Sequence, residues 1–238
     1  ILVFTGQVFI YNFFENLEKD FNTYTPEEIL NLFIKKNKHL FYFDEIENKK
    51  VNLDLNIYKK RYLEIFKNND FNKKNFLLSL YLAYHLMFNK DNSELKSIVH
   101  HSHHVSETRN FIKDFQNAKL LVTIRDPRAN LKSGIVNWIK FDHIYENQKH
   151  FYFYLRRIRE DLNFALKTKN KLFIKLEEAN ENTLKVKLAN YLGVEYDKNL
   201  ERATFLGEIW EGDKLSNLKG FNGKYNSGVK DNQWQEFF

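Results

Sequence analysis

The chain has 238 residues, of which 43% are hydrophobic, and a formal net charge of +6. These values provide for a sizeable core, argue against intrinsic disorder and suit a polyanionic ligand. The absence of cysteine excludes disulfides and thiolate metal sites, and we expect a reducing location, the cytoplasm. No apolar run is long enough for a membrane span. No basic run interleaved with aromatic residues indicates nucleic-acid binding.

The first part of the chain predicts helices. Residues 1–6 are apolar but lack an initiator methionine and the basic start of a signal peptide, so we expect the chain to begin within a longer protein. Residues 25–36 open with Thr-Pro-Glu-Glu, a helix cap followed by proline and two acids. Two further helices are expected at roughly 54–68 and 72–89.

The second part predicts short strands alternating with helices. Strands are expected at 98–99, 119–124 and 171–176, and helices at about 106–115, from 127 onward, at 142–168 and up to Gly193. This strand–helix–strand order implies right-handed crossovers and parallel pairing. Residues 197–238 are glycine-rich and are interpreted as loops.

The junction after residues 120–124 is a candidate anion site. Arg125 follows the expected strand, Asp126 can cap a helix, and Pro127 suits the first helical position. A helix N-terminus attracts anions, and a guanidinium beside it offers two parallel donors to a phosphate or sulfate. The alternative is that Arg125 pairs with Asp126 or a neighbouring acid and only ties the strand to the surface.

Four histidines follow the strand at 98–99. His100, His101, His103 and His104 allow three interpretations: a general base, a metal site, or a polar loop between strand and helix. Adjacent histidines on a strand end point in different directions, which weakens the metal interpretation.

Arg-Asp-Pro with a serine eight positions after the arginine resembles the 3′-phosphate-binding segment of sulfotransferases that use 3′-phosphoadenosine 5′-phosphosulfate (PAPS). The resemblance implies that Arg125 and Ser133 hold the 3′-phosphate. It also implies that His103, 22 residues before Arg125, is the catalytic base, with His101 and His104 as alternatives. The implied fold is a three-layer α/β domain over residues 1–238, with a central parallel sheet flanked by helices, as in P-loop NTPases.

Further segments match the family more loosely. Glu177-Glu178 after the strand at 171–176 resembles the family's Tyr-Glu-Asp, with Leu176 in place of the tyrosine that approaches the nucleotide. Lys219 or Lys224 in the glycine-containing tail corresponds to a basic loop that reaches the 3′-phosphate, although a plain surface loop is the alternative. The family's opening loop for the 5′-phosphosulfate has no match, so we expect a chain truncated at its N-terminus.

The resemblance implies transfer of a sulfuryl group from PAPS to a hydroxyl or amine of a small-molecule or glycan acceptor. No metal is required by this scheme. Two alternatives are a non-catalytic module that binds a nucleotide or anion, and a metal-dependent hydrolase built on the histidine cluster.

Overall fold

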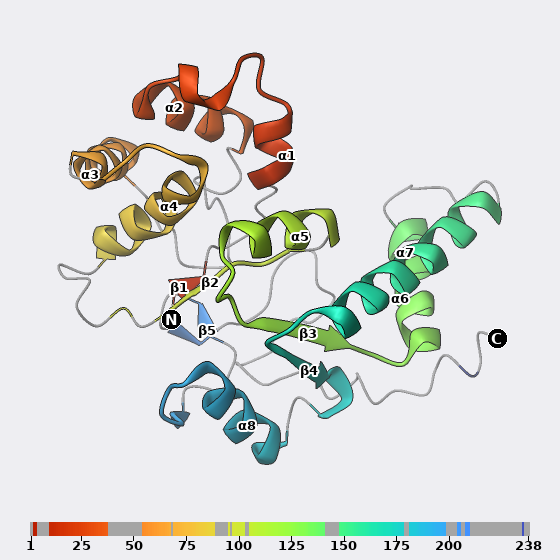
Figure 1. Ribbon diagram of the computed structural model, residues 1–238. Coiled ribbons are helices and arrows are strands. Elements are labelled where there is room, and N and C mark those ends of the chain that lie inside the picture. The colour runs from red at the N-terminus through yellow and green to blue at the C-terminus, as the bar shows by residue number, and fades with distance from the viewer. Residues whose placement is uncertain are drawn as a thin grey trace. The chain divides into compact units, whose positions relative to one another are not determined.

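The computed structural model describes residues 2–3, 10–37, 54–67, 69–88, 95, 97–102, 105–140, 148–178, 181–198, 204–205, 208–209 and 235. The chain is mixed α/β and mostly helical, and its described strands form short pairs, both parallel and antiparallel (Figure 1). It divides into two compact units, residues 1–116 and 117–238.

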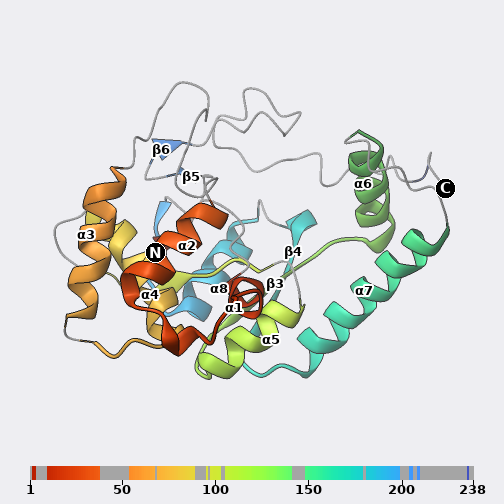
Figure 2. The same cartoon turned by 90° about the horizontal axis from the view of Figure 1, so that it is seen from above.

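The first unit is largely helical and carries one parallel strand pair. Its elements are β1 (Leu2–Val3), α1 (Ile10–Glu15), a 3₁₀ turn η1 (Phe21–Thr23), α2 (Pro26–Lys36), α3 (Leu55–Phe66), α4 (Lys73–Phe88), β2 (Ile98–Val99) and α5 (Val105–Asp114). The helices expected from the sequence are confirmed, and α3 and α4 pack side by side (Figures 1 and 2). β1 pairs with β2 in parallel.

The start of α2 shows why its sequence predicted a helix. The Thr25 hydroxyl accepts a hydrogen bond from the Glu28 N–H at 3.3 Å, and the Glu28 carboxylate accepts one from the Thr25 N–H at 2.8 Å. This reciprocal capping box satisfies amides that the helix itself leaves unpaired. Pro26 occupies the first helical position, where its missing N–H costs nothing.

An aromatic core holds the helices of the first unit together. Phe76 on α4 is fully buried. Its ring lies 5.7–6.2 Å from the rings of Phe13, Phe14, Phe21, Phe33 and Tyr62. These rings come from α1, η1, α2 and α3, so a single side chain packs against four elements of the unit. Stacked and edge-on ring pairs of this kind add to the stability gained by burial.

A buried carboxylate clasps α1 to α5. Glu107 on α5 is 5% exposed, and its two oxygens accept hydrogen bonds from the N–H groups of Tyr11 at 3.0 Å and Asn12 at 2.7 Å. The Tyr11 hydroxyl donates to Asp114 at 2.8 Å. Burial, together with Asp114, raises the pKa of Tyr11 above its usual range. The Tyr11 and Asn12 amides in the first turn of α1 therefore donate to Glu107, a side chain about 95 residues later in the sequence.

The second unit contains the longer parallel strand pair. Its elements are β3 (Leu120–Ile124), α6 (Pro127–Lys140), α7 (Gln148–Lys167), β4 (Lys171–Lys175), a 3₁₀ turn η3 (Leu176–Glu178), α8 (Asn182–Leu192), β5 (Thr204–Phe205) and β6 (Glu208–Ile209). β3 and β4 pair in parallel, in a register that runs from Leu120 opposite Lys171 to Ile124 opposite Lys175. The predicted parallel arrangement is thus confirmed for these two strands. A central sheet that joins β2 to β3 stays a prediction.

The end of α8 follows its sequence, but part of the tail does not. Gly193 adopts the left-handed conformation at φ 76°, and its N–H and that of Val194 donate to Ala189 near the helix end. Residues 197–238 were expected to be loops, yet β5 and β6 form an antiparallel pair. Two residues separate these strands, the commonest hairpin spacing, and strands of two residues leave too little alternation to detect.

None of the helices in the described ranges combines the length and the apolar character that a membrane span requires.

Candidate anion site at the β3–α6 junction

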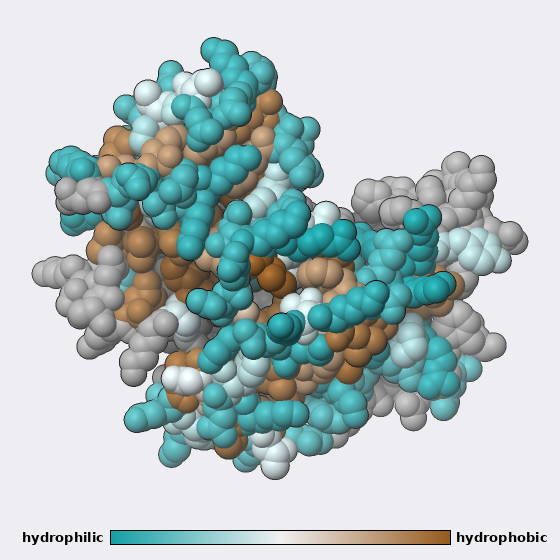
Figure 3. Space-filling view, viewed as in Figure 1, coloured by the Kyte–Doolittle hydropathy of each residue, from teal (hydrophilic) through white to brown (hydrophobic). Residues whose placement is uncertain are grey.

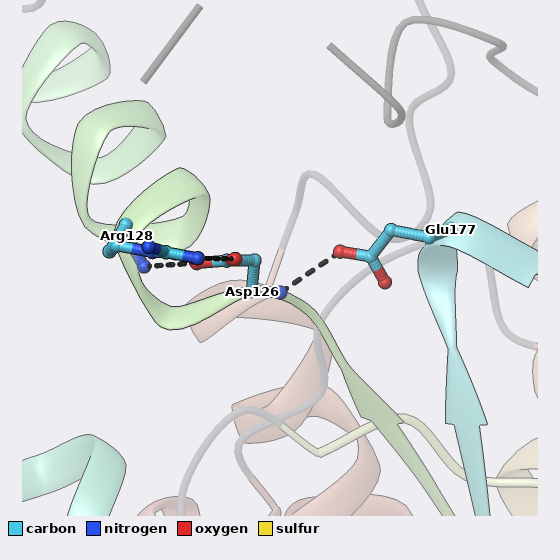
Figure 4. A network of polar contacts seen from close by, with 3 residues as sticks. All are labelled: Asp126, Arg128 and Glu177. Atoms are coloured by element: carbon cyan, nitrogen blue, oxygen red, sulfur yellow. Dashed lines mark hydrogen bonds and ion pairs between the residues drawn. The ribbon is translucent and has the colours of Figure 1, made fainter. Parts of the chain in front are cut away.

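The candidate site lies where two parallel strands end side by side. β3 ends at Ile124, and Arg125 and Asp126 lead directly into α6. β4 ends at Lys175, opposite Ile124, and η3 places Glu177 two residues further on. Because the carboxyl ends of parallel strands meet at one edge, side chains from both strand ends come together there, and open α/β sheets bind ligands at such edges. Figure 4 shows the polar contacts of this junction.

Asp126 caps α6 as its sequence predicted. Its carbonyl oxygen accepts a hydrogen bond from the Asn130 N–H at 2.9 Å, and its Oδ1 accepts one from the Arg128 N–H at 2.8 Å. The Arg128 guanidinium also reaches back over the carboxylate, with Nε 3.0 Å from Oδ1 and Nη2 2.7 Å from Oδ2 (Figure 4). These contacts with Arg128 lower the pKa of Asp126 to about 2, so this carboxylate stays charged and paired at neutral pH.

Glu177 ties the end of β4 to the end of β3. Its Oε1 accepts a hydrogen bond from the Asp126 N–H at 2.9 Å, across 51 residues of sequence (Figure 4). The next acid, Glu178, pairs instead with Lys175 at 3.0 Å on the exposed side. Sequence reasoning interpreted both acids as first-turn residues of a helix or as a family segment. Glu177 in fact fixes the backbone immediately after Arg125.

The backbone amides at the start of α6, which were expected to bind an anion, are already hydrogen-bonded within the chain. Pro127 has no N–H, the Asp126 N–H donates to Glu177, and the Arg128 N–H donates to the Asp126 side chain. The Ala129 N–H makes a further, smaller contribution to the lowered pKa of Asp126. Carboxylates of the chain itself therefore occupy the first turn, and an anion at this junction must be held by side chains.

Unlike Asp126, Arg128 and Glu177, Arg125 has a buried polar atom with no hydrogen bond among the described residues. Its side chain is half-buried, and its Nε is buried without a hydrogen-bond partner in the part of the chain that the structure describes. The alternative interpretation, in which Arg125 pairs with Asp126, finds no support: both residues are described, no ion pair joins them, and Arg128 engages both oxygens of that carboxylate. Among the described residues no other acid forms an ion pair with Arg125.

Ser133 lies on α6, seven residues after its cap. Positions seven apart fall on the same face of a helix, so Ser133 is on the face of α6 that Asp126 begins. Its side chain is half-buried. The two residues expected to hold a 3′-phosphate are therefore both described, in the same unit and on consecutive parts of one strand–helix junction.

The other predicted site residues cannot be placed in the same way. His103, Lys219 and Lys224 lie outside the described residues, as does His104. Their roles stay predictions.

His100 is described and belongs to the core of the first unit. Its ring stacks on Phe111 with centroids 4.7 Å apart, and its Nδ1 is 2.9 Å from the Tyr81 hydroxyl. Burial, with a smaller contribution from His101, lowers the pKa of His100 to about 4. One of the four clustered histidines is thus a neutral, partly buried residue that packs on Phe111. Within the described ranges, no three histidine or acidic side chains are placed to hold a metal ion.

Sequence reasoning missed two residues that organise the structure. Glu177 had a usable signal, because an acid directly after a strand lies at the same edge as the end of a parallel neighbour. Glu107 had none, because an acid in the first turn of a helix is common for reasons local to that helix.

Comparisons with known proteins identify no relative: no protein-family model matches this chain, and neither does any curated protein or solved structure.

Proposed function

We propose that this protein is a PAPS-dependent sulfotransferase with a three-layer α/β fold, in which Arg125 and Ser133 hold the 3′-phosphate of the nucleotide. The observation that carries the proposal is the buried Nε of Arg125, which has no partner among the described residues. Leaving such a donor unsatisfied costs about 1–3 kcal/mol, and in folded proteins a chain group, an ordered water or a bound ion usually satisfies it. A phosphate oxygen would complete its hydrogen bonding.

Arginine suits this task better than any other side chain. Its guanidinium presents Nε–H and an Nη–H in parallel, which matches two oxygens of a phosphate. The neighbouring Arg128 cannot serve in the same way, because its Nε and Nη2 already bind Asp126. In the described part of the junction, Arg125 is therefore the guanidinium available to an external anion.

The network around Arg125 supports it mechanically and electrostatically. Glu177 and the Asp126 cap hold the backbone on the C-terminal side of Arg125, and the five-residue pairing of β3 with β4 holds it on the N-terminal side. Arg128 neutralises Asp126, so a bound phosphate would not face an uncompensated carboxylate there. Binding groups held by such supporting contacts need little reordering when a ligand arrives.

The proposed chemistry is in-line transfer of the sulfuryl group. His103 removes the proton of the acceptor hydroxyl or amine, the acceptor atom bonds to sulfur, and the bond from sulfur to the nucleotide phosphate breaks. The products are a sulfated small molecule or glycan and adenosine 3′,5′-bisphosphate. Lys219 or Lys224 would add positive charge near the 3′-phosphate, and the reaction would take place in the cytoplasm without a metal.

One feature of the family has no counterpart at the corresponding place. In that family the first strand leads into a loop and a helix that cradle the 5′-phosphosulfate. The start of α1 does not stand in for this loop, because its Tyr11 and Asn12 amides are bound by Glu107. We therefore propose that residues other than the start of α1 hold this group.

A thermal-shift experiment with adenosine 3′,5′-bisphosphate tests the site. The nucleotide should raise the Tm of the wild-type chain by about 5 °C at 100 times its Kd. Arg125→Ala should abolish this shift and Ser133→Ala should reduce it. Arg156→Ala is the matched control, because it removes the same charge from an exposed side chain of α7 and leaves the junction intact. A shift that survives Arg125→Ala, or is lost equally in Arg156→Ala, would contradict the site.

A transfer assay separates the enzyme from the alternatives. The chain should move radiolabelled sulfate from PAPS to a member of a broad acceptor panel. His103→Ala should stop transfer while the nucleotide shift persists. A normal nucleotide shift with no transfer would favour a binding module, whereas stabilisation by zinc alone would favour a hydrolase.

A further inference from the structure

The helix α7 exposes an apolar face that the site does not use. Among the described residues, seven large hydrophobic side chains are exposed, and four of them lie on this one helix. They are Tyr152, Leu155, Leu162 and Leu166, with exposed fractions of 65%, 38%, 39% and 60%. Ala165 on the same helix is buried, so α7 has a distinct inner side. Figure 3 shows brown surface among the teal side chains in the region of α7.

The exposed positions follow a heptad pattern. Tyr152, Leu155, Arg159, Leu162 and Leu166 are separated by three, four, three and four residues. We call these five residues the α7 stripe. This spacing keeps side chains on one seam along four turns of helix, and it is the pattern by which one helix packs knobs into the holes of another. Scattered surface leucines would not produce it.

We propose that the α7 stripe binds an amphipathic helix of a second protein that presents apolar residues at the same spacing and an acidic residue opposite Arg159. The apolar residues of the α7 stripe supply the contact area, and Arg159 at its centre makes binding specific for a partner with an acidic residue. A cation at a core position is tolerated only when an anion or a polar group faces it. Exposed Arg156 beside the stripe is already paired with Glu160 at 2.8 Å, so Arg159 is the residue that gives the stripe its own positive charge.

A second copy of this chain does not satisfy the α7 stripe. In a parallel pair of α7 helices in register, Arg159 would face Arg159. The stripe is nearly symmetric about Arg159, since Leu155 and Leu162 flank it and Tyr152 and Leu166 end it. An antiparallel pair would therefore also bring the two arginines together, and like charges juxtaposed in an interface are strongly unfavourable.

The test uses a synthetic three-heptad peptide as the probe. It carries leucine at the core positions, one glutamate at the central core position, and glutamate at the flanking positions so that it does not pair with itself. Fluorescence anisotropy should show binding of the labelled peptide to the full chain. A twin peptide with lysine in place of every glutamate should bind at least about tenfold more weakly.

Two variants locate the binding. Leu162→Asp should weaken binding of the glutamate peptide at least about tenfold, because it replaces an apolar contact by a charge of the wrong sign. Val186→Asp is the matched control, since Val186 is 43% exposed but lies on α8, and it should leave binding unchanged. Arg159→Glu alters an exposed side chain and should transfer the preference to the lysine peptide.

Three results would overturn the proposal: equal binding of the two peptides or no binding, an unchanged preference in Arg159→Glu, or equal losses in Leu162→Asp and Val186→Asp. Sedimentation gives an independent test. A wild-type dimer that Leu162→Asp dissociates would assign the α7 stripe to a second copy of the chain instead.

Discussion

Glu107 in the first unit and Arg125 in the second are both charged side chains drawn into the protein, and their partners differ. Both oxygens of Glu107 accept hydrogen bonds from backbone amides of α1, and its side chain is 5% exposed. Arg125 is only half-buried, but its Nε is shielded from solvent and has no partner among the described residues. The chain itself satisfies the hydrogen bonding of Glu107, whereas it leaves the Nε of Arg125 available to a ligand.

This difference separates a structural role from a binding role. A buried charge costs several kcal/mol unless it is paired and hydrogen-bonded, so a group that serves stability is fully partnered within the chain. A group that serves binding keeps some of its capacity open and reduces the stability of the unliganded protein. Substitutions at the two sites should therefore have opposite effects on the unfolding free energy. The predictions below begin with the core that surrounds Glu107.

The largest effect is expected from the aromatic core. Phe76→Ala should lower the unfolding free energy by about 4 kcal/mol, because it leaves a cavity among five surrounding rings. Leu166→Ala removes a large side chain that is 60% exposed and should change the value by less than about 0.5 kcal/mol. Urea unfolding followed by circular dichroism measures both. Similar losses in the two variants would show that the core is not centred on Phe76.

Removing the carboxylate of Glu107 should be the next most costly change. Glu107→Ala leaves the Tyr11 and Asn12 amides without acceptors and should cost about 3 kcal/mol. Glu107→Gln should cost less than Glu107→Ala, because its remaining oxygen still accepts one of the two bonds, although its amide nitrogen cannot accept the other. The same urea experiment tests the order. Equal stability of wild type and Glu107→Ala would remove the contrast with Arg125.

His100 should make stability depend on pH. Its pKa is lowered to about 4 in the folded chain, while the unfolded chain titrates near 6.5. Above pH 6.5 both states are neutral. As the pH falls toward 4 only the unfolded state gains the proton, so stability is lost, by up to roughly 3 kcal/mol. Urea midpoints across this interval should fall less in His100→Gln. An unchanged slope would mean that the ring is accessible to water.

The smallest change, and the one of opposite sign, is expected at Arg125. Arg125→Met removes the unpartnered donor but keeps an unbranched side chain, so the unliganded protein should be unchanged or up to about 1 kcal/mol more stable. Glu107→Met should instead be destabilising. Parallel urea titrations without nucleotide decide between the two. A clear loss of stability in Arg125→Met would identify Arg125 as a structural residue.

Local signals in the sequence were enough to predict most of the helices and the strand–helix junction. Thr25 and Glu28 announce α2, Gly193 marks the end of α8, and Asp126 with Pro127 marks the start of α6. Each is a short-range device whose hydrogen bonds lie within a few residues, so the amino-acid types alone define the geometry. The position of Arg125 at the end of a strand was predicted for the same reason.

Long-range contacts were not predictable from the same information. The bonds from Glu107 to α1 and from Glu177 to Asp126 join residues far apart in sequence, and no periodicity encodes them. The expectation of free amides at α6 was wrong because Asp126 and Glu177 both bind there. Two-residue strands such as β5 also escape pattern analysis, because alternation needs several residues to appear.

The clasp between α1 and α5 has a consequence for synthesis on the ribosome. Tyr11 meets its acceptor on Glu107 only after another 96 residues have been added. At about 5–20 residues per second, this interval lasts roughly 5–20 seconds. Throughout this interval α1 lacks its contact with Glu107. For most of the interval the phenylalanines of α1 also lack Phe76. The N-terminal segment therefore most needs a chaperone while the rest of the chain is still being synthesised.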